Sequence, residues 1–150
     1  MSNILIISSG ADLSPFKKYR VGQIDGSKTP TLKSFYQAIE KALSFPNDFE
    51  YTFESLDQFL NDLEWIEHPN VALYITQAEG FLAQEKPAKV IELLNLLDAT
   101  AEDWKWVDDD VQPKNLKIFI EHSSKIVGLL EREEDRKYKR YRKDFETLGR

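Results

Sequence analysis

Three stretches of the chain are apolar along nearly their whole length. They are ILII at residues 4–7, NVALYIT at residues 70–76 and LKIFIE at residues 116–121. All three indicate strands, and the continuous run at 70–76 is typical of a strand that is covered on both faces of a sheet. KYRVGQIDG, at residues 18–26, ends in an Asp-Gly turn signal and indicates a further short strand.

Between these strands, apolar residues recur every three or four positions, which predicts helices. The first helix is expected over residues 29–45, with Thr29 as its cap. The second is expected to begin near Thr52, because a threonine oxygen can accept a hydrogen bond from the first turn of a helix. The third is expected over residues 87–104, where a proline is placed for helix initiation.

Strands that alternate with helices predict an α/β fold, in which right-handed crossovers join the strands of a parallel sheet. Residues 71–76 and 116–121 are expected to be parallel neighbours, with the strand at 19–24 beside them. The length of 150 residues suits one domain with one core. The end of the chain reads as a long, mostly charged helix. The predicted organisation is therefore a domain over residues 1–124 and a charged helical extension over residues 125–150.

The second predicted helix lies within FPNDFEYTFESLDQFLNDLEWI, residues 45–66, which holds six acidic residues and no Lys or Arg. At about 100° per residue, its apolar positions fall on one side. The residues expected to face the core are Phe53, Leu56, Phe59, Leu60, Leu63 and Ile66. The opposite side holds Glu54, Asp57, Gln58, Asn61, Asp62 and Glu64.

Two interpretations of this acidic side are open. Composition alone favours a solvated face, which is what a charge run usually marks. A solvent face generally mixes signs, however, because opposite charges one turn apart attract and like charges repel. Folding stability therefore does not explain a face without a positive member. A row of carboxylates and amides on a rigid helix can instead imitate the spaced phosphates of a nucleic acid for a basic cleft.

The charge of the whole chain agrees with a basic partner. The net charge is −6, and residues 131–150 hold eight Lys or Arg against six Asp or Glu, which leaves −8 on the first 130 residues. An acidic body argues against nucleic-acid binding, because phosphate contacts need Lys and Arg. The chain has no cysteine, which fits a reducing compartment and predicts a cytoplasmic protein. No apolar run is long enough for a signal peptide or a membrane span, so no membrane association is expected.

The sequence offers little for catalysis. His68 and His122 lie in no nucleophile or metal motif, and DDD at 108–110 lacks the spacing and the glycine of a calcium loop. No glycine-rich phosphate loop occurs. Paired carboxylates such as Glu54 and Asp57 could do acid-base work only in a cleft, which a convex helix face does not offer. We therefore predict a protein without enzymatic activity, cofactor or metal.

The carboxyl-terminal run RKYKRYRK, residues 136–143, interleaves six positive charges with two tyrosines. This composition can hold nucleic acid by charge and stacking. On a helix, the acidic residues one turn earlier can pair with these charges, which favours a self-paired solvent helix. Direct nucleic-acid binding is expected only through Arg136 to Lys143. An RNA- or nucleoprotein-associated regulator that binds through this helix is accordingly the alternative function.

The segment at 45–66 also resembles the barstar family, in which Phe-Pro, an aromatic-Gly turn and Asn-x-Asp-Ala-Leu lead into a helix that ends in Asp-Leu and an aromatic. VGQIDG, the strand at 71–76, the helix through LLNLLDATAEDW and the strand LKIFIE follow in the family's order, so the resemblance covers about residues 19–121. It implies a three-stranded parallel sheet packed with helices, to which this chain adds an amino-terminal strand and a long carboxyl-terminal helix. It also implies a non-catalytic inhibitor or immunity protein that blocks the active site of a basic microbial ribonuclease or a related nuclease toxin.

The resemblance assigns the partner-binding positions one by one. They fall on Asp48, Phe49, Glu54, Asp57, Gln58, Asn61, Asp62 and Asp98. Three positions depart from the family's pattern. Glu50 and Thr52 replace the usual glycine and asparagine, and Gln58 replaces an aspartate that is the dominant contact in the type inhibitor. A glutamine cannot supply a buried charge.

Overall fold

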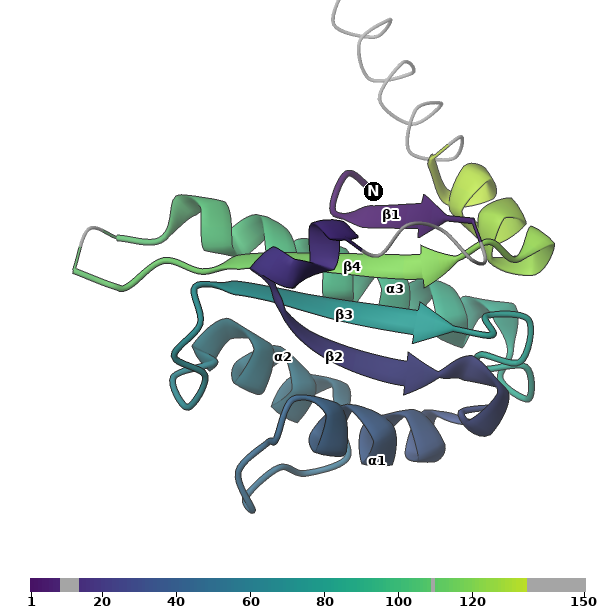
Figure 1. The fold of residues 1–150 in the computed structure, drawn as a ribbon. Coiled ribbons are helices and arrows are strands. Elements are labelled where there is room, and N and C mark those ends of the chain that lie inside the picture. The colour runs from purple at the N-terminus through teal and green to yellow at the C-terminus, as the bar shows by residue number, and fades with distance from the viewer. Residues whose placement is uncertain (9–13, 109, 135–150) are drawn as a thin grey trace, which may run out of the picture.

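In the described part of the chain, four parallel strands form a single sheet in the order β1-β4-β3-β2 (Figure 1). The structure is a computed structural model that describes residues 1–8, 14–108 and 110–134. The strands are β1 (Ile4–Ile7), β2 (Arg20–Asp25), β3 (Asn70–Thr76) and β4 (Asn115–Glu121). Leu73 of β3 lies between Gly22 of β2 and Ile118 of β4, so the predicted parallel pairing of the two apolar runs with the strand at 19–24 is confirmed.

The amino-terminal strand is part of this sheet and does not stand apart from it. β1 pairs in parallel with β4, in a register that places Ile4 beside Ile118 and Ile7 beside Glu121. The sheet therefore has four strands where the resemblance implied three. The physical reason is that β4 would otherwise leave its backbone donors and acceptors exposed along one edge, and the apolar ILII segment pairs with them.

The helices begin close to where the sequence predicts them, with one shift. α2 (Phe53–Asp62) is capped by Thr52 as predicted, and α3 (Pro87–Asp103) begins at its proline. α1 (Leu32–Ala42) is capped by Thr31 instead of Thr29. Thr29 follows the short 3-10 helix η2 (Gly26–Lys28). It is buried, and its hydroxyl donates to the carbonyl of Gly26. It is therefore engaged before the helix starts.

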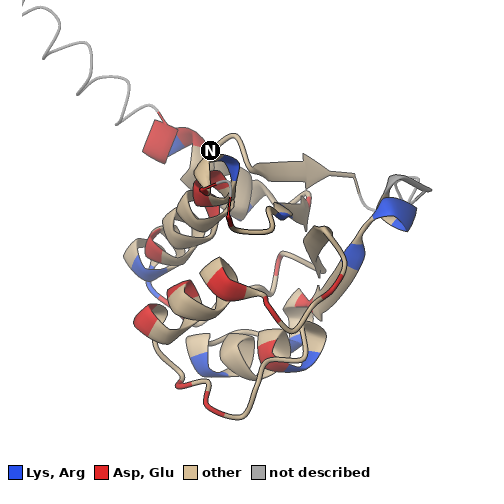
Figure 2. Ribbon diagram, turned by 90° about the vertical axis from the view of Figure 1, so that its left-hand side faces the viewer, with Lys and Arg blue, Asp and Glu red and all other residues tan. Residues whose placement is uncertain are grey.

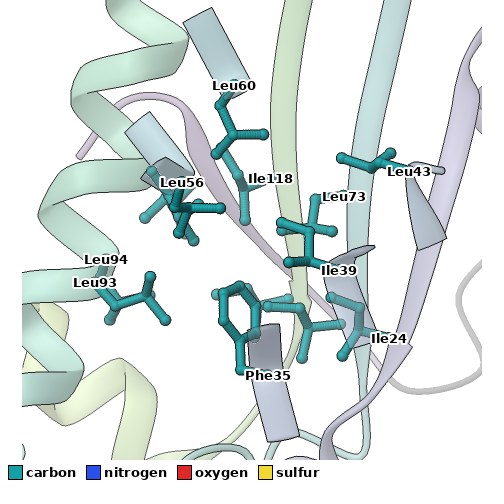
Figure 3. Close-up of a cluster of buried hydrophobic side chains, with 14 of the residues drawn as sticks. Ile24, Phe35, Ile39, Leu43, Leu56, Leu60, Leu73, Leu93, Leu94 and Ile118 are labelled. Atoms are coloured by element: carbon teal, nitrogen blue, oxygen red, sulfur yellow. The ribbon is translucent and has the colours of Figure 1, made fainter. Parts of the chain in front are cut away.

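One face of the sheet carries the main core. Ile24, Leu73 and Ile118 alternate inward from three strands and are at most 1% exposed. Figure 3 shows these residues surrounded by side chains of α1, α2 and α3. On the opposite face, Phe16 of the 3-10 helix η1 (Ser14–Lys18) packs its ring against Tyr74 and Phe119.

After β4 the chain is helical from residue 124 through 134. Ile126 and Leu129 of this segment are buried in the common core, so the first turns of the predicted extension pack onto the domain. The predicted nucleic-acid segment, Arg136 to Lys143, lies outside the described residues.

A further 3-10 turn, η3 (Trp104–Trp106), follows α3. Across the described residues, no helix combines the length and apolarity that a membrane crossing requires.

Gly26, at the end of β2, touches the backbone of β3. A Cβ atom at this position would lie 2.4 Å from the carbonyl oxygen of Gln77 and 2.6 Å from that of Thr76. Backbone cannot move aside as a flexible side chain can, so Gly26→Ala is expected to lower the free energy of unfolding by about 1–3 kcal/mol. Urea-induced unfolding measures the loss.

Gly128 provides the matched control. It lies in the helix at 124–134, and a Cβ atom there would meet only the Arg132 guanidinium at 3.5 Å, an ordinary contact. Gly128→Ala should therefore stabilise the protein, because alanine is favoured over glycine inside a helix by up to about 1 kcal/mol. Equal effects of the two substitutions would contradict the close approach of β2 and β3 at Gly26.

Candidate functional site

α2 is fixed to the body of the protein by its apolar side. Leu56 and Leu60 are at most 1% exposed, and the Trp104 indole donates to the carbonyl of Leu60 over 2.8 Å. Phe53 and Phe59 are partly buried. All six residues predicted on the opposite side are exposed, which confirms the division of this helix into two faces. The exposed residues are Glu54, Asp57, Gln58, Asn61, Asp62 and Glu64.

The carboxylates on α2 have no cationic partner within the described part of the chain. The ion pairs found there join Met1 to Glu134, Lys89 to Glu92 and Lys105 to Glu102. Lys89, at the start of α3, also lies over the ring of Phe53 at 5.5 Å from the centroid. In Figure 2, α2 and the loop before it carry red segments and no blue one. Among the described residues, no ion pair thus neutralises a carboxylate of this surface.

Asp57 is the most constrained of these acids. The Asn61 side chain, one turn later, donates to its Oδ1 over 2.9 Å, and the Thr100 hydroxyl of α3 donates to the same oxygen over 3.0 Å. Glu54 has no hydrogen bond or ion pair among the described residues. It lies in the first turn of α2, where the helix dipole favours a negative charge.

The loop before α2 separates its two predicted contacts. Asp48 is exposed, whereas the Phe49 side chain is only 7% exposed and packs against Tyr36, Phe45 and Phe59. Phe49 therefore anchors the loop to the core. The exposed aromatic residue of the loop is Tyr51, which the sequence analysis did not select.

Tyr51 is 40% exposed, and its hydroxyl donates to the Glu40 carboxylate over 3.1 Å. Its ring stacks on that of Tyr36, with centroids 5.8 Å apart. It stands immediately before the cap of α2, so it borders the acidic surface. The sequence signal that could have identified Tyr51 is an aromatic residue between two polar residues, Glu50 and the cap Thr52. Such a position is not expected to be part of the core.

Asp98 lies apart from the α2 surface. Its carboxylate accepts a hydrogen bond from the backbone N–H of Asn3 over 3.0 Å, at the amino-terminal end of β1. Thr100, two residues further along α3, contacts α2, so Asp98 faces away from α2. A role for Asp98 in binding remains a prediction. The family pattern gives no information on Asn3, because that residue lies outside the resemblance.

Asn3 organises a small polar cluster around the end of α3. Its side-chain amide donates to the carbonyl of Asp98 and to the Glu102 carboxylate. Hydrogen bonds from Asn3, Lys105 and Trp106 lower the pKa of Glu102 from 4.5 to about 2. The carboxylates of Asp98 and Glu102 are thus both engaged in hydrogen bonds within the protein.

A groove continues the acidic surface beyond the carboxyl-terminal end of α2. Asp62, Glu64, Glu67 and Asp110 line it together with Lys114 and neighbouring side chains. The Lys114 ammonium donates to the carbonyls of Ile66 and His68, and burial lowers its pKa. Among the described residues, no group of three or more His, Asp or Glu side chains could hold a metal ion.

Asp62 lies where the helix dipole opposes it. It is the last residue of α2, whose last turn holds no basic residue, and the helix ends at Leu63 with φ of 50°. Removing the charge by Asp62→Asn is therefore expected to raise the free energy of unfolding by about 0.3–1 kcal/mol at low salt. Urea unfolding at low ionic strength measures the gain. The same measurement near 1 M salt, where the Debye length is about 3 Å, should show a smaller one. A loss of stability at low salt would contradict this electrostatic cost.

The sequence relationship agrees with this arrangement of elements. The family model described as Barstar (barnase inhibitor) matches residues 19–121. The matched stretch includes β2, β3, β4 and all three α-helices named here, whereas β1 and the helical segment after residue 124 lie outside it. Comparison with curated proteins gives no match. Since the family model spans more than half of the chain, the protein belongs to the barstar family of barnase inhibitors.

Proposed function

We propose that this protein is a non-catalytic inhibitor or immunity protein that blocks the active site of a basic ribonuclease or a related nuclease toxin. The binding surface is formed by α2 and the loop before it. The observation that carries the proposal is the row of exposed carboxylates, without an interspersed Lys or Arg, on α2, which the core holds rigidly. Membership of the barstar family supports the same class of partner.

The mechanism follows from charge and rigidity. A nuclease cleft that binds RNA presents Lys and Arg to phosphates, and the α2 carboxylates can occupy the phosphate positions. Complementary charge increases the rate of encounter. Because α2 is held by Leu56, Leu60 and Trp104, little backbone ordering is needed when the complex forms. The inhibitor performs no reaction, since it acts by covering the cleft.

Gln58 alters what the partner must offer at the centre of this surface. It is exposed between the acids of α2 and carries no charge. A partner that placed a desolvated cation against Gln58 would lose the compensating charge, whereas a partner with a hydrogen-bonding neutral group there would not. The cognate nuclease is thus expected to place its cations against Glu54, Asp57 and Asp62 instead.

The experiment that tests the proposal is an inhibition assay. Purified protein is titrated into barnase, and into the product of the neighbouring gene, while RNA hydrolysis is followed at low and high salt. Stoichiometric inhibition of either enzyme that weakens as salt rises is the expected result. If neither enzyme is bound or inhibited, the proposal fails.

A deletion of residues 135–150 separates this function from the alternative regulator. The proposed inhibitor keeps its affinity for the nuclease without these residues, because the proposed contacts all come from α2 and the loop before it. The alternative places binding in Arg136 to Lys143 and requires polyanion affinity that disappears with the deletion. Nuclease binding that is lost with the tail but survives neutralisation of the α2 acids would favour the alternative.

A further inference from the structure

Two side chains hold one oxygen of the Asp57 carboxylate. The Asn61 amide donates to Oδ1 over 2.9 Å, and to the Asp57 carbonyl over 2.8 Å. The Thr100 hydroxyl donates to the same Oδ1 over 3.0 Å, from a residue that is 0% exposed on α3. The first contact lies within α2, whereas the second crosses between two helices. The Asp57 carboxylate is thereby held by two hydrogen bonds to one oxygen, although the residue is exposed.

We infer that Thr100 is a positioning residue for nuclease binding, because its hydroxyl holds Asp57 in the orientation in which Asp57 binds the partner. The inference rests on the proposed function. An exposed aspartate normally loses rotamer freedom when it enters an interface, and that loss lowers affinity. The contacts from Thr100 and Asn61 place much of this ordering in the free protein. Asp57 thus reaches the partner already oriented.

The same geometry defines the contact that Asp57 can make. A carboxylate oxygen accepts about two hydrogen bonds, so the donors from Asn61 and Thr100 occupy Oδ1. Oδ2 remains to accept from the partner. A single-oxygen acceptor suits a lysine ammonium or one nitrogen of an arginine. Glu54 has both oxygens unengaged among the described residues and suits the two-nitrogen fork of an arginine.

A purely structural role for this hydrogen bond is the competing explanation. The Thr100 hydroxyl is buried and needs an acceptor. A threonine within a helix can, however, donate to the carbonyl one turn earlier, so its hydroxyl does not require Asp57. If the contact served only to satisfy the hydroxyl, removing it would change stability and leave binding by the folded protein unchanged. The two roles therefore differ in a measurable way.

The test combines Thr100→Val, which removes the hydroxyl at nearly constant volume, with Thr100→Ser, which keeps it. Side-chain coupling constants of Asp57 are measured by NMR in the free proteins. The wild type and Thr100→Ser should show one dominant χ1 rotamer, and Thr100→Val should show averaging. An Asp57 side chain that averages equally in the wild type overturns the inference, whether or not a nuclease binds.

Binding is measured with barnase as the probe, in a double-mutant cycle with Asp57→Ala. Thr100→Val should weaken binding about three- to tenfold, mainly through faster dissociation, because the charge that steers association is unchanged. In the Asp57→Ala background the same substitution should have no further effect. An equal loss in both backgrounds, or no loss in either, overturns the inference. Failure of the wild type to bind barnase removes barnase as the nuclease partner in the proposed function, while the NMR measurement still decides whether Thr100 positions Asp57.

Discussion

Removing the charge of Glu54 or Asp57 is expected to weaken the nuclease complex by about 2–5 kcal/mol per substitution, as Glu54→Gln or Asp57→Asn. Truncating one member of a close, desolvated charge pair leaves the other charge buried and unpaired, which is the origin of this large loss. Folding should change by no more than about 1 kcal/mol, because both side chains are exposed and the largest expected cost is the lost interaction of Glu54 with the helix dipole. Binding and stability are thus expected to separate.

Calorimetric titration of the nuclease, with thermal unfolding of the same variants, measures both quantities. Glu79→Gln is the matched control, since Glu79 is an exposed acid in the turn after β3 and outside the α2 surface. It changes net charge equally and should leave affinity nearly unchanged. If Glu79→Gln weakens binding as much as Glu54→Gln does, the effect comes from net charge, and a specific contact of α2 is excluded.

Most of the fold could be predicted from the sequence because its signals are local. The apolar runs of β3 and β4 identify strands by themselves, and the helical connection between them favours the parallel pairing that is found. The start of α2 at Thr52 follows from one residue type at one position. The cap of α1 could not be assigned in this way, because Thr29 and Thr31 both have the right side chain. The turn after β2 engages the Thr29 hydroxyl and leaves the cap to Thr31.

In the candidate site too, features that depend on local sequence could be predicted, and features that depend on tertiary packing could not. The exposure of Glu54 and Asp57 follows from helical periodicity, which acts over one or two turns. The burial of Phe49, by contrast, depends on aromatic rings from α1, α2 and the loop itself. The Thr100 contact with Asp57 joins residues 43 positions apart. No pattern within either helix specifies such a contact, since it depends on how α2 packs against α3.

Asp98 shows how a family pattern can be altered by residues outside it. Asn3 immediately precedes β1, and the family match includes neither, yet its backbone N–H donates a hydrogen bond to the Asp98 carboxylate. β1 is present at this edge because ILII pairs with β4. A segment outside the family match can thus engage a residue that the resemblance predicts for binding. The α2 surface is unaffected, because none of its carboxylates contacts β1 among the described residues.

Leu56→Ala is expected to lower stability and to change binding little, whereas the charge substitutions lower binding and change stability little. Leu56 is 0% exposed and points from α2 into the cluster around Ile118 (Figure 3). Its truncation removes buried apolar area and leaves a cavity, which should lower the free energy of unfolding by about 2–5 kcal/mol. The carboxylates of α2 remain in place on the opposite side, so protein that is still folded should bind the nuclease with little change. Urea unfolding, followed by titration under conditions where the variant is folded, measures the two effects separately.

Leu5→Ala is the matched control for this substitution, because it removes the same atoms from a leucine that is 40% exposed on β1. Its cost should be well below that of Leu56→Ala, since less apolar area is lost and solvent can fill the space. The contrast tests the assignment of the two faces of α2. If Leu56→Ala were tolerated as well as Leu5→Ala, α2 would not be anchored through Leu56, and the rigid presentation of Glu54 and Asp57 on which the inhibitor mechanism depends would lose its support.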